Sequence, residues 1–137
     1  MSYPIEKIVG IGPTYGEKLS KVGIKFTKEF LAAAGTPKDR DELSKKTGIS
    51  KDLILKWANH CDLMRIPGLG SVEADILENI GVDTVPELAQ RKPENLHAAV
   101  EEYVKKTKGR WCPDLETIHK WVFYAGNRNL FPRMLEY

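Results

Sequence analysis

We predict an all-helical fold for this chain of 137 residues from three features of its sequence. Apolar residues recur at the three- and four-residue spacing of helices, and no segment alternates polar and apolar residues as a half-buried strand does. Glycines and prolines divide the chain into segments of helix length, where they act as stop and start signals. A turn with two glycines around one apolar residue occurs twice, each time directly before a helical segment.

The first part of the chain recurs 58 positions later without a gap. Ile8–Pro13 aligns with Ile66–Ser71, and we call their cores the first glycine turn (Ile8–Gly12) and the second glycine turn (Ile66–Gly70). The alignment then continues through matched residues: Leu19 with Leu77, Val22 with Ile80, Gly23 with Gly81, Ile24 with Val82, Glu29 with Glu87 and Phe30 with Leu88. The matched glycines, apolar positions and spacing indicate an internal repeat.

The first repeat, residues 5–35, is expected to form two short helices after its turn. In both turns we expect positive φ at the two glycines, which have no Cβ to oppose it. Pro13 suits the first helical position, where its missing N–H costs nothing, and Gly23 suits the position just after the helix end. Thr27 is expected to cap a second helix, Lys28–Ala34, that Gly35 ends.

Two connecting helices are expected between the repeats, within residues 36–65. The pair Thr36-Pro37 predicts the start of the first, which ends near Gly48. Ser50 is expected to cap the second, a longer helix that leads into the second glycine turn. Apolar residues at helical spacing form one stripe along it: Leu53, Ile54, Trp57, Cys61 and Met64.

The second repeat, residues 66–91, is expected to follow the same plan with different caps. Ser71 is a good N-cap for the helix that Gly81 ends. The segment from Thr84 to Glu87 has the pattern of a capping box, offset by one residue from the cap expected in the first repeat.

Two additional helices are expected in the C-terminal part, residues 92–137. One begins at Pro93 and continues to about Thr107, with Leu96, Val100, Tyr103 and Val104 on one side. Another begins at Pro113 and stops at Gly126, with a buried side of Leu115, Ile118, Val122 and Ala125. The tail after it is expected to add one turn.

The sequences Gly10-Ile11-Gly12 and Gly68-Leu69-Gly70 resemble the helix-hairpin-helix motif, because each follows an apolar residue and precedes a short helix ending in glycine. Two such motifs resemble the tandem domain of DNA ligases, repair nucleases and Holliday-junction-binding proteins. Over nearly the whole chain, the segments 11–15, 47–50, 57–66 and 87–91 resemble the 4332 family of domains of unknown function. The resemblance implies one all-α domain, residues 1–137: a tandem helix-hairpin-helix (SAM-like) bundle with additional C-terminal helices.

The resemblance also implies how the first glycine turn would act. In DNA-binding relatives of this motif, backbone N–H groups hold a phosphate at a helix N-terminus, where unpaired donors and a partial positive charge attract anions. Here the donors would be Gly12, Thr14 and Tyr15, since Pro13 has no N–H. The residues of the expected nucleic-acid site are Gly10, Ile11, Gly12, Thr14, Tyr15, Lys18, Lys21 and Lys25.

Two interpretations of this turn remain open. In the first, it binds DNA or another nucleic acid through phosphates, without reading sequence. In the second, it only packs helices together, and its lysines form a solvated face.

The second glycine turn is poorly suited to an anion. Its helix carries Glu73, Asp75 and Glu78, whose carboxylates stand where a phosphate would approach. We therefore interpret the second repeat as structural, or as a surface that binds a basic protein partner. This alternative function, a protein-interaction or scaffold module, could also use the apolar residues of the C-terminal region: Trp121, Phe123, Tyr124, Leu130, Phe131, Leu135 and Tyr137. We expect most of these residues to pack within the monomer.

The segment Lys105–Arg110, followed by Trp111, combines cations with an indole, as single-strand-binding surfaces do. We favour a simpler interpretation. Lysines in the last turn of a helix complement its dipole, and Trp111 is expected to fold back onto the core.

No arrangement of residues indicates catalysis. His60, His97 and His119 are scattered, and Cys61 and Cys112 lack the spacing of a zinc site. We expect reduced, mostly buried thiols. The sequence therefore predicts a protein that is not an enzyme, with no metal and no cofactor.

Charge and hydropathy set the remaining expectations. The net charge of +2 is unevenly distributed: 11 Lys and Arg stand against 7 Asp and Glu in residues 1–60, 3 against 7 in 61–100, and 7 against 5 in 101–137. No apolar run approaches the roughly 20 residues that span a bilayer, and the N-terminus lacks the pattern of a signal peptide. We expect a cytoplasmic monomer without membrane contact.

Overall fold

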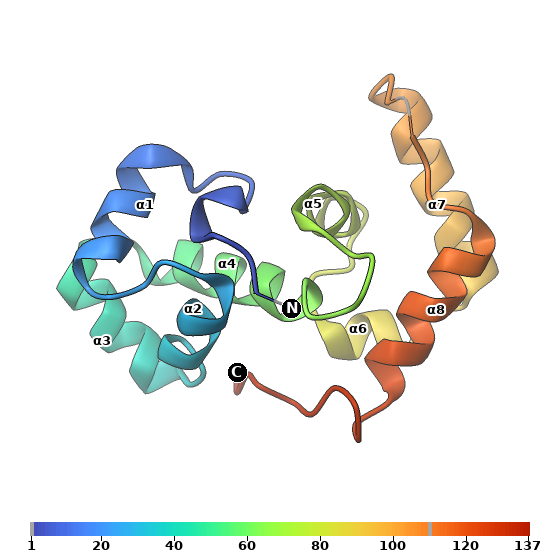
Figure 1. Ribbon diagram of the computed structural model, residues 1–137. Coiled ribbons are helices and arrows are strands. Elements are labelled where there is room, and N and C mark those ends of the chain that lie inside the picture. Colours follow the sequence, from blue (N-terminus) through green and yellow to red (C-terminus); the bar gives the residue numbers. More distant parts are fainter. Residues whose placement is uncertain (1, 110) are drawn as a thin grey trace.

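The computed structural model describes residues 2–109 and 111–137, and its regular structure is helical (Figure 1). A single β-bridge, between Pro4 and Phe26, is the nearest approach to a sheet in these residues, so the all-α prediction is confirmed. None of the described helices has the length and apolar character that crossing a membrane requires. The elements are η1 (Ile5–Lys7), α1 (Gly12–Lys21), α2 (Thr27–Ala33), α3 (Pro37–Thr47), α4 (Lys51–Leu63), α5 (Ser71–Asn79), α6 (Val85–Ala89), α7 (Pro93–Lys106) and α8 (Leu115–Gly126).

The helices form two groups that lie side by side, α1 to α4 and α5 to α8 (Figure 1). In the first group α2 and α3 both pack on α4, and in the second group α6 and α7 both pack on α8. Helix α4 also contacts α5 and α6, and these contacts join the groups. The same packing pattern therefore occurs twice, with α7 and α8 in the positions that α3 and α4 take in the first group.

A buried tryptophan supports each glycine turn. Trp57 of α4 and Trp121 of α8 are each 1% exposed. A Cβ atom at Gly10 would lie 3.8 Å from Nε1 of Trp57, and one at Gly68 would lie 3.8 Å from Nε1 of Trp121. Because glycine has no side chain, the backbone of each turn approaches an indole closely.

The connecting helices begin and end as expected. The Thr36 hydroxyl accepts the N–H of Asp39 at 3.1 Å, and the Ser50 hydroxyl accepts the N–H of Leu53 at 3.2 Å. Gly48 ends α3 in the left-handed conformation with φ of 73°. These contacts are local along the chain, which is why sequence signals find them.

Two expected caps are wrong because each hydroxyl binds a distant segment. Thr27 is the first residue of α2, and its oxygen accepts the N–H of Tyr3 at 3.0 Å. Ser71 is the first residue of α5, and its oxygen accepts the N–H of Val9 at 2.8 Å. The observed N-caps of α2 and α6 are Phe26 and Thr84, which are 58 residues apart, so the expected one-residue offset between repeats is also wrong.

Helix α8 differs from the expectation in its start and its buried side. Asp114, not Pro113, is the N-cap, and the buried residues are Ile118, Trp121 and Ala125. The buried side of α8 is centred on Trp121, because this indole lies under the second glycine turn. Leu115 is consequently exposed, and Val122 is only partly buried.

The cap of α8 makes its stability depend on pH. An oxygen of Asp114 accepts the N–H of Thr117 at 2.8 Å, and hydrogen bonds from Thr117 lower the pKa of this carboxyl. Stability from a lowered acidic pKa is present above the ordinary value and is lost as pH falls through the lowered one. We expect Asp114→Ala to reduce Tm at neutral pH and to reduce it less in strong acid, measured by circular dichroism. An equal reduction at both pH values would contradict a charge-dependent cap.

The C-terminal tail returns from α8 to the first group of helices (Figure 1). It makes the expected single turn, closed by the N–H of Phe131 donating to the carbonyl of Asn127 at 2.8 Å. The N–H of Glu136 then donates to the carbonyl of Gly35 at 2.8 Å, and Leu135 is buried. The tail thus links the end of the second group to α2 and α3.

Candidate functional site

The first glycine turn leaves the start of α1 open. Gly10 and Gly12 have φ of 94° and 62°, in agreement with the expectation for this turn, and Ile11 between them is buried. A Cβ at Gly12 would have no atom within 4 Å. The N–H groups up to the third helical residue lack intrahelical acceptors, so Gly12 and Thr14 present donors here. Tyr15 is the fourth helical residue, where an N–H ordinarily donates to the carbonyl of the N-cap, here Ile11. The structure therefore brings Gly12 and Thr14, two of the three expected donors, to one accessible helix end.

The three lysines expected at this site are exposed, and two have partners. The ammonium group of Lys18 lies over the ring of Tyr15, 5.7 Å from its centroid, which holds this cation near the start of α1. Lys21 forms an exposed ion pair with Glu17, with 3.6 Å between the charged atoms. Lys25 lies beyond the end of α1. The first turn of α1 contains no acidic residue, so no carboxylate of the helix opposes an anion there.

The second glycine turn is closed by its own helix. Gly68 has φ of 80°, but Gly70 has φ of −94°, so the expectation of two left-handed glycines is wrong for this turn. A Cβ at Gly70 would lie 3.1 Å from Oε2 of Glu73. The carboxylate of Glu73 therefore lies over the start of α5, where it complements the helix dipole as an anion would.

A hydrogen bond joins the two turns. The N–H of Val9, in the first turn, donates to the hydroxyl of Ser71 at 2.8 Å, directly after the second turn. The open and the closed helix starts are therefore neighbours on one side of the molecule. Sequence reasoning did not find this contact, because it connects residues 62 positions apart.

The basic segment after α7 differs in part from the expectation. Lys105 and Lys106 occupy the last turn of α7, as the dipole interpretation requires. Trp111 is 53% exposed, so the expectation that it folds back onto the core is wrong. Neighbouring Cys112 is half-buried, so it does not join Cys61 as a buried thiol. Arg110 lies outside the described residues.

Sequence reasoning missed a group of polar residues between α4 and α5. His60 is buried, and its Nε2 lies 2.5 Å from an oxygen of Glu78. Asp75 lies one turn before Glu78 on α5, and one ligand atom from each of the three residues lies within 4.8 Å of the other two. The acidic pair was visible in the sequence, but the pairing of α5 with His60 of α4 was not.

Comparison with known proteins gives a family but no function. The family model described as "Domain of unknown function (DUF4332)" matches residues 9–128, which include all the α-helices, the second glycine turn and the first glycine turn from Val9 on. No curated protein and no solved structure matches the chain. The family match covers most of the 137 residues and agrees with the resemblance found in the sequence. The chain therefore belongs to the DUF4332 family.

Proposed function

We propose that this protein is a tandem helix-hairpin-helix module that binds DNA without enzymatic activity, through the first glycine turn. One observation carries the proposal: the start of α1 is open at Gly12 and free of acidic residues in its first turn, whereas the equivalent start of α5 is covered by Glu73. A phosphate needs the first arrangement, because its oxygens must reach backbone N–H groups without meeting a carboxylate.

The lysines supply the electrostatic part of binding. The ammonium group of Lys18 lies over the ring of Tyr15, and it would contact a phosphate beside the one at Gly12. Lys21 and Lys25 extend the basic surface along α1 and past its end. Contacts of this kind hold the backbone of DNA and do not distinguish bases. The expected activity is therefore binding that is independent of sequence and sensitive to salt.

Salt dependence tests the proposal. With three to four phosphates contacted, the logarithm of the association constant should fall with the logarithm of salt concentration at a slope of about −3. The double variant Lys18→Glu, Lys21→Glu should weaken binding at low salt at least about tenfold and make the slope shallower, because it removes two cations and adds two anions. The affinity and its salt dependence are measured by fluorescence anisotropy with a labelled duplex of unrelated sequence.

A control variant with the same change of total charge shows whether the loss of affinity depends on the position of the lysines at the first glycine turn. Lys45 and Lys46 are exposed in the last turn of α3, and their reversal to Glu changes the total charge equally. This control should retain most of the affinity. Absence of binding by the parent chain at low salt, or equal loss in both double variants, would contradict the proposal.

The alternative, a protein-binding surface on the acidic residues of α5, has less support. Glu78 is paired with His60 and lies 3.6 Å from the ammonium group of Lys56. Glu73 lies over Gly70. Two of the three carboxylates expected to meet a basic partner are thus already used within the chain.

A further inference from the structure

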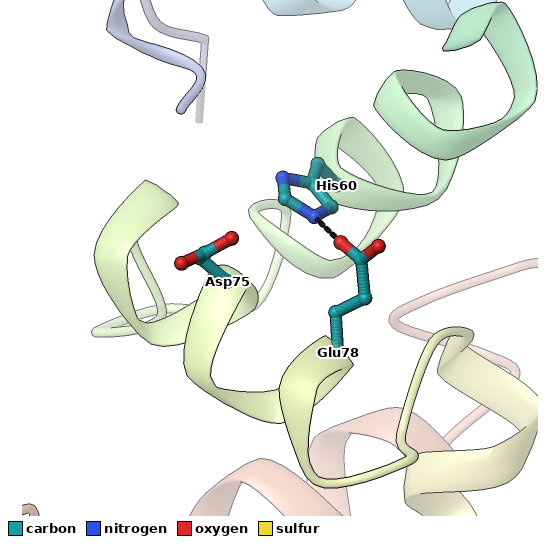
Figure 2. A group of neighbouring side chains, drawn as sticks. All are labelled: His60, Asp75 and Glu78. Atoms are coloured by element: carbon teal, nitrogen blue, oxygen red, sulfur yellow. Dashed lines mark hydrogen bonds and ion pairs between the residues drawn. The ribbon is translucent and has the colours of Figure 1, made fainter. Parts of the chain in front are cut away.

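The residues His60, Asp75 and Glu78 meet between two helices (Figure 2). The ring of His60 comes from α4, and the two carboxylates come from consecutive turns of α5. Their ligand atoms lie within 4.8 Å of one another. A tetrahedral zinc ion with bonds of about 2.1 Å needs ligand atoms about 3.4 Å apart, so small rotations of these side chains would suffice.

The histidine of this group is held firmly and directs Nε2 toward Glu78. His60 is 1% exposed, so its ring is fixed by the surrounding core. Its Nε2 faces Glu78, whereas its Nδ1 is buried and has no hydrogen-bond partner among the described residues. A proton on Nδ1 would be a buried donor without an acceptor, which is costly. The neutral ring therefore keeps its proton on Nε2, shared with Glu78, and a metal ion bound at Nε2 would displace this proton.

The surroundings favour a cation and allow it to enter. A pocket of about 210 Å³ reaches His60 and Glu78, and it is also lined by Asp52, Asn59 and Asp83. Burial and repulsion from Glu87 and Glu78 raise the pKa of Asp83, as expected where acidic groups gather. Lys56 also lines this pocket, and its ammonium group lies 3.6 Å from Glu78, where it would compete with the ion. A divalent ion would relieve the repulsion among these carboxylates.

We propose that His60, Asp75 and Glu78 bind a divalent transition-metal ion of the zinc class. One imidazole nitrogen with two carboxylate oxygens suits zinc and its neighbours better than magnesium or calcium, which prefer oxygen ligands alone. Three protein ligands leave a fourth position for a water molecule. The site lies between α4 and α5, so the ion would also strengthen the junction between the two groups of helices.

Calorimetric titration with zinc chloride tests the site in full-length protein freed of its affinity tag and of bound metal. We expect one equivalent of zinc to bind and to raise Tm, because a ligand that binds only the folded state stabilises it. Asp75→Asn and Glu78→Gln keep the side-chain shape and should each weaken binding at least about tenfold. Lys56→Met should instead strengthen binding severalfold, because it removes a competing cation next to Glu78.

Controls exclude other ligands. His97 pairs with Glu101 and His119 pairs with Glu94, away from this group, so His97→Gln with His119→Gln should leave zinc binding unchanged. Cobalt in place of zinc should give visible absorption bands without a thiolate band, because Cys61 and Cys112 take no part. The proposal is overturned by the absence of saturable binding, by unchanged affinity in Asp75→Asn, by loss of binding in the histidine control, or by a thiolate band.

Discussion

Replacing Trp57 with alanine should lower the free energy of unfolding by about 3–5 kcal/mol, the cost typical of removing a large buried aromatic side chain. The indole is 1% exposed and meets two aromatic rings, with its centroid 5.1 Å from that of Tyr15 and 6.4 Å from that of Phe30. It also lies under Gly10. The substitution therefore removes contacts to α1, α2 and the first glycine turn together. Urea unfolding followed by circular dichroism measures the change.

Trp111 provides the matched control, because it is the same residue type and is 53% exposed. Its replacement with alanine should change stability by no more than about 0.5 kcal/mol. If both tryptophan variants lost similar stability, the first glycine turn would not depend on the indole beneath it.

Arg40→Met should destabilise the protein by about 2–3 kcal/mol, because it leaves carbonyl acceptors without their charged donor. Arg40 is 5% exposed. Its Nη1 donates to the carbonyl of Ala34 at 2.9 Å, and its Nη2 donates to the carbonyl of Glu136 at 2.7 Å. The side chain thus connects the end of α2 to the C-terminal tail. Urea unfolding gives the loss of stability.

Limited trypsin digestion shows whether the tail is released. Cleavage after Arg128 and Arg133 should accelerate in Arg40→Met, because residues 127–137 lose one of their contacts with the first group of helices. Lys38→Met, an exposed change on the same helix, is the control and should behave like the parent chain. Unchanged stability and unchanged cleavage in Arg40→Met would show that the tail is held by other contacts.

The helices could be predicted from the sequence wherever their signals are local. Thr36, Ser50 and Thr84 cap the helices that follow them, and Gly23 and Gly81 end helices, because each contact involves residues three to five positions away. The same reasoning predicted caps at Ser71 and Thr27 that the structure does not contain. Their hydroxyls accept N–H groups from distant segments, and a capping residue has the same appearance in the sequence whichever donor it serves.

The contrast between the two glycine turns was only half predictable. The acidic residues after the second turn indicated that an anion would be repelled there, and the position of Glu73 over Gly70 agrees with that reasoning. The closeness of the turns through Val9 and Ser71, and the group of His60 with the acids of α5, depend on how the two sets of helices pack. No pattern within a single helix contains that information.

The most direct test of our account is an NMR titration of the full chain, labelled with nitrogen-15, with a short DNA duplex at low salt. We predict that the backbone amide signals of Gly12, Thr14 and Tyr15 shift most and saturate together, while those of Gly70, Val72 and Glu73 stay in place. Larger shifts at the second glycine turn, or no shift at the first, would contradict the claim that only the first turn receives a phosphate.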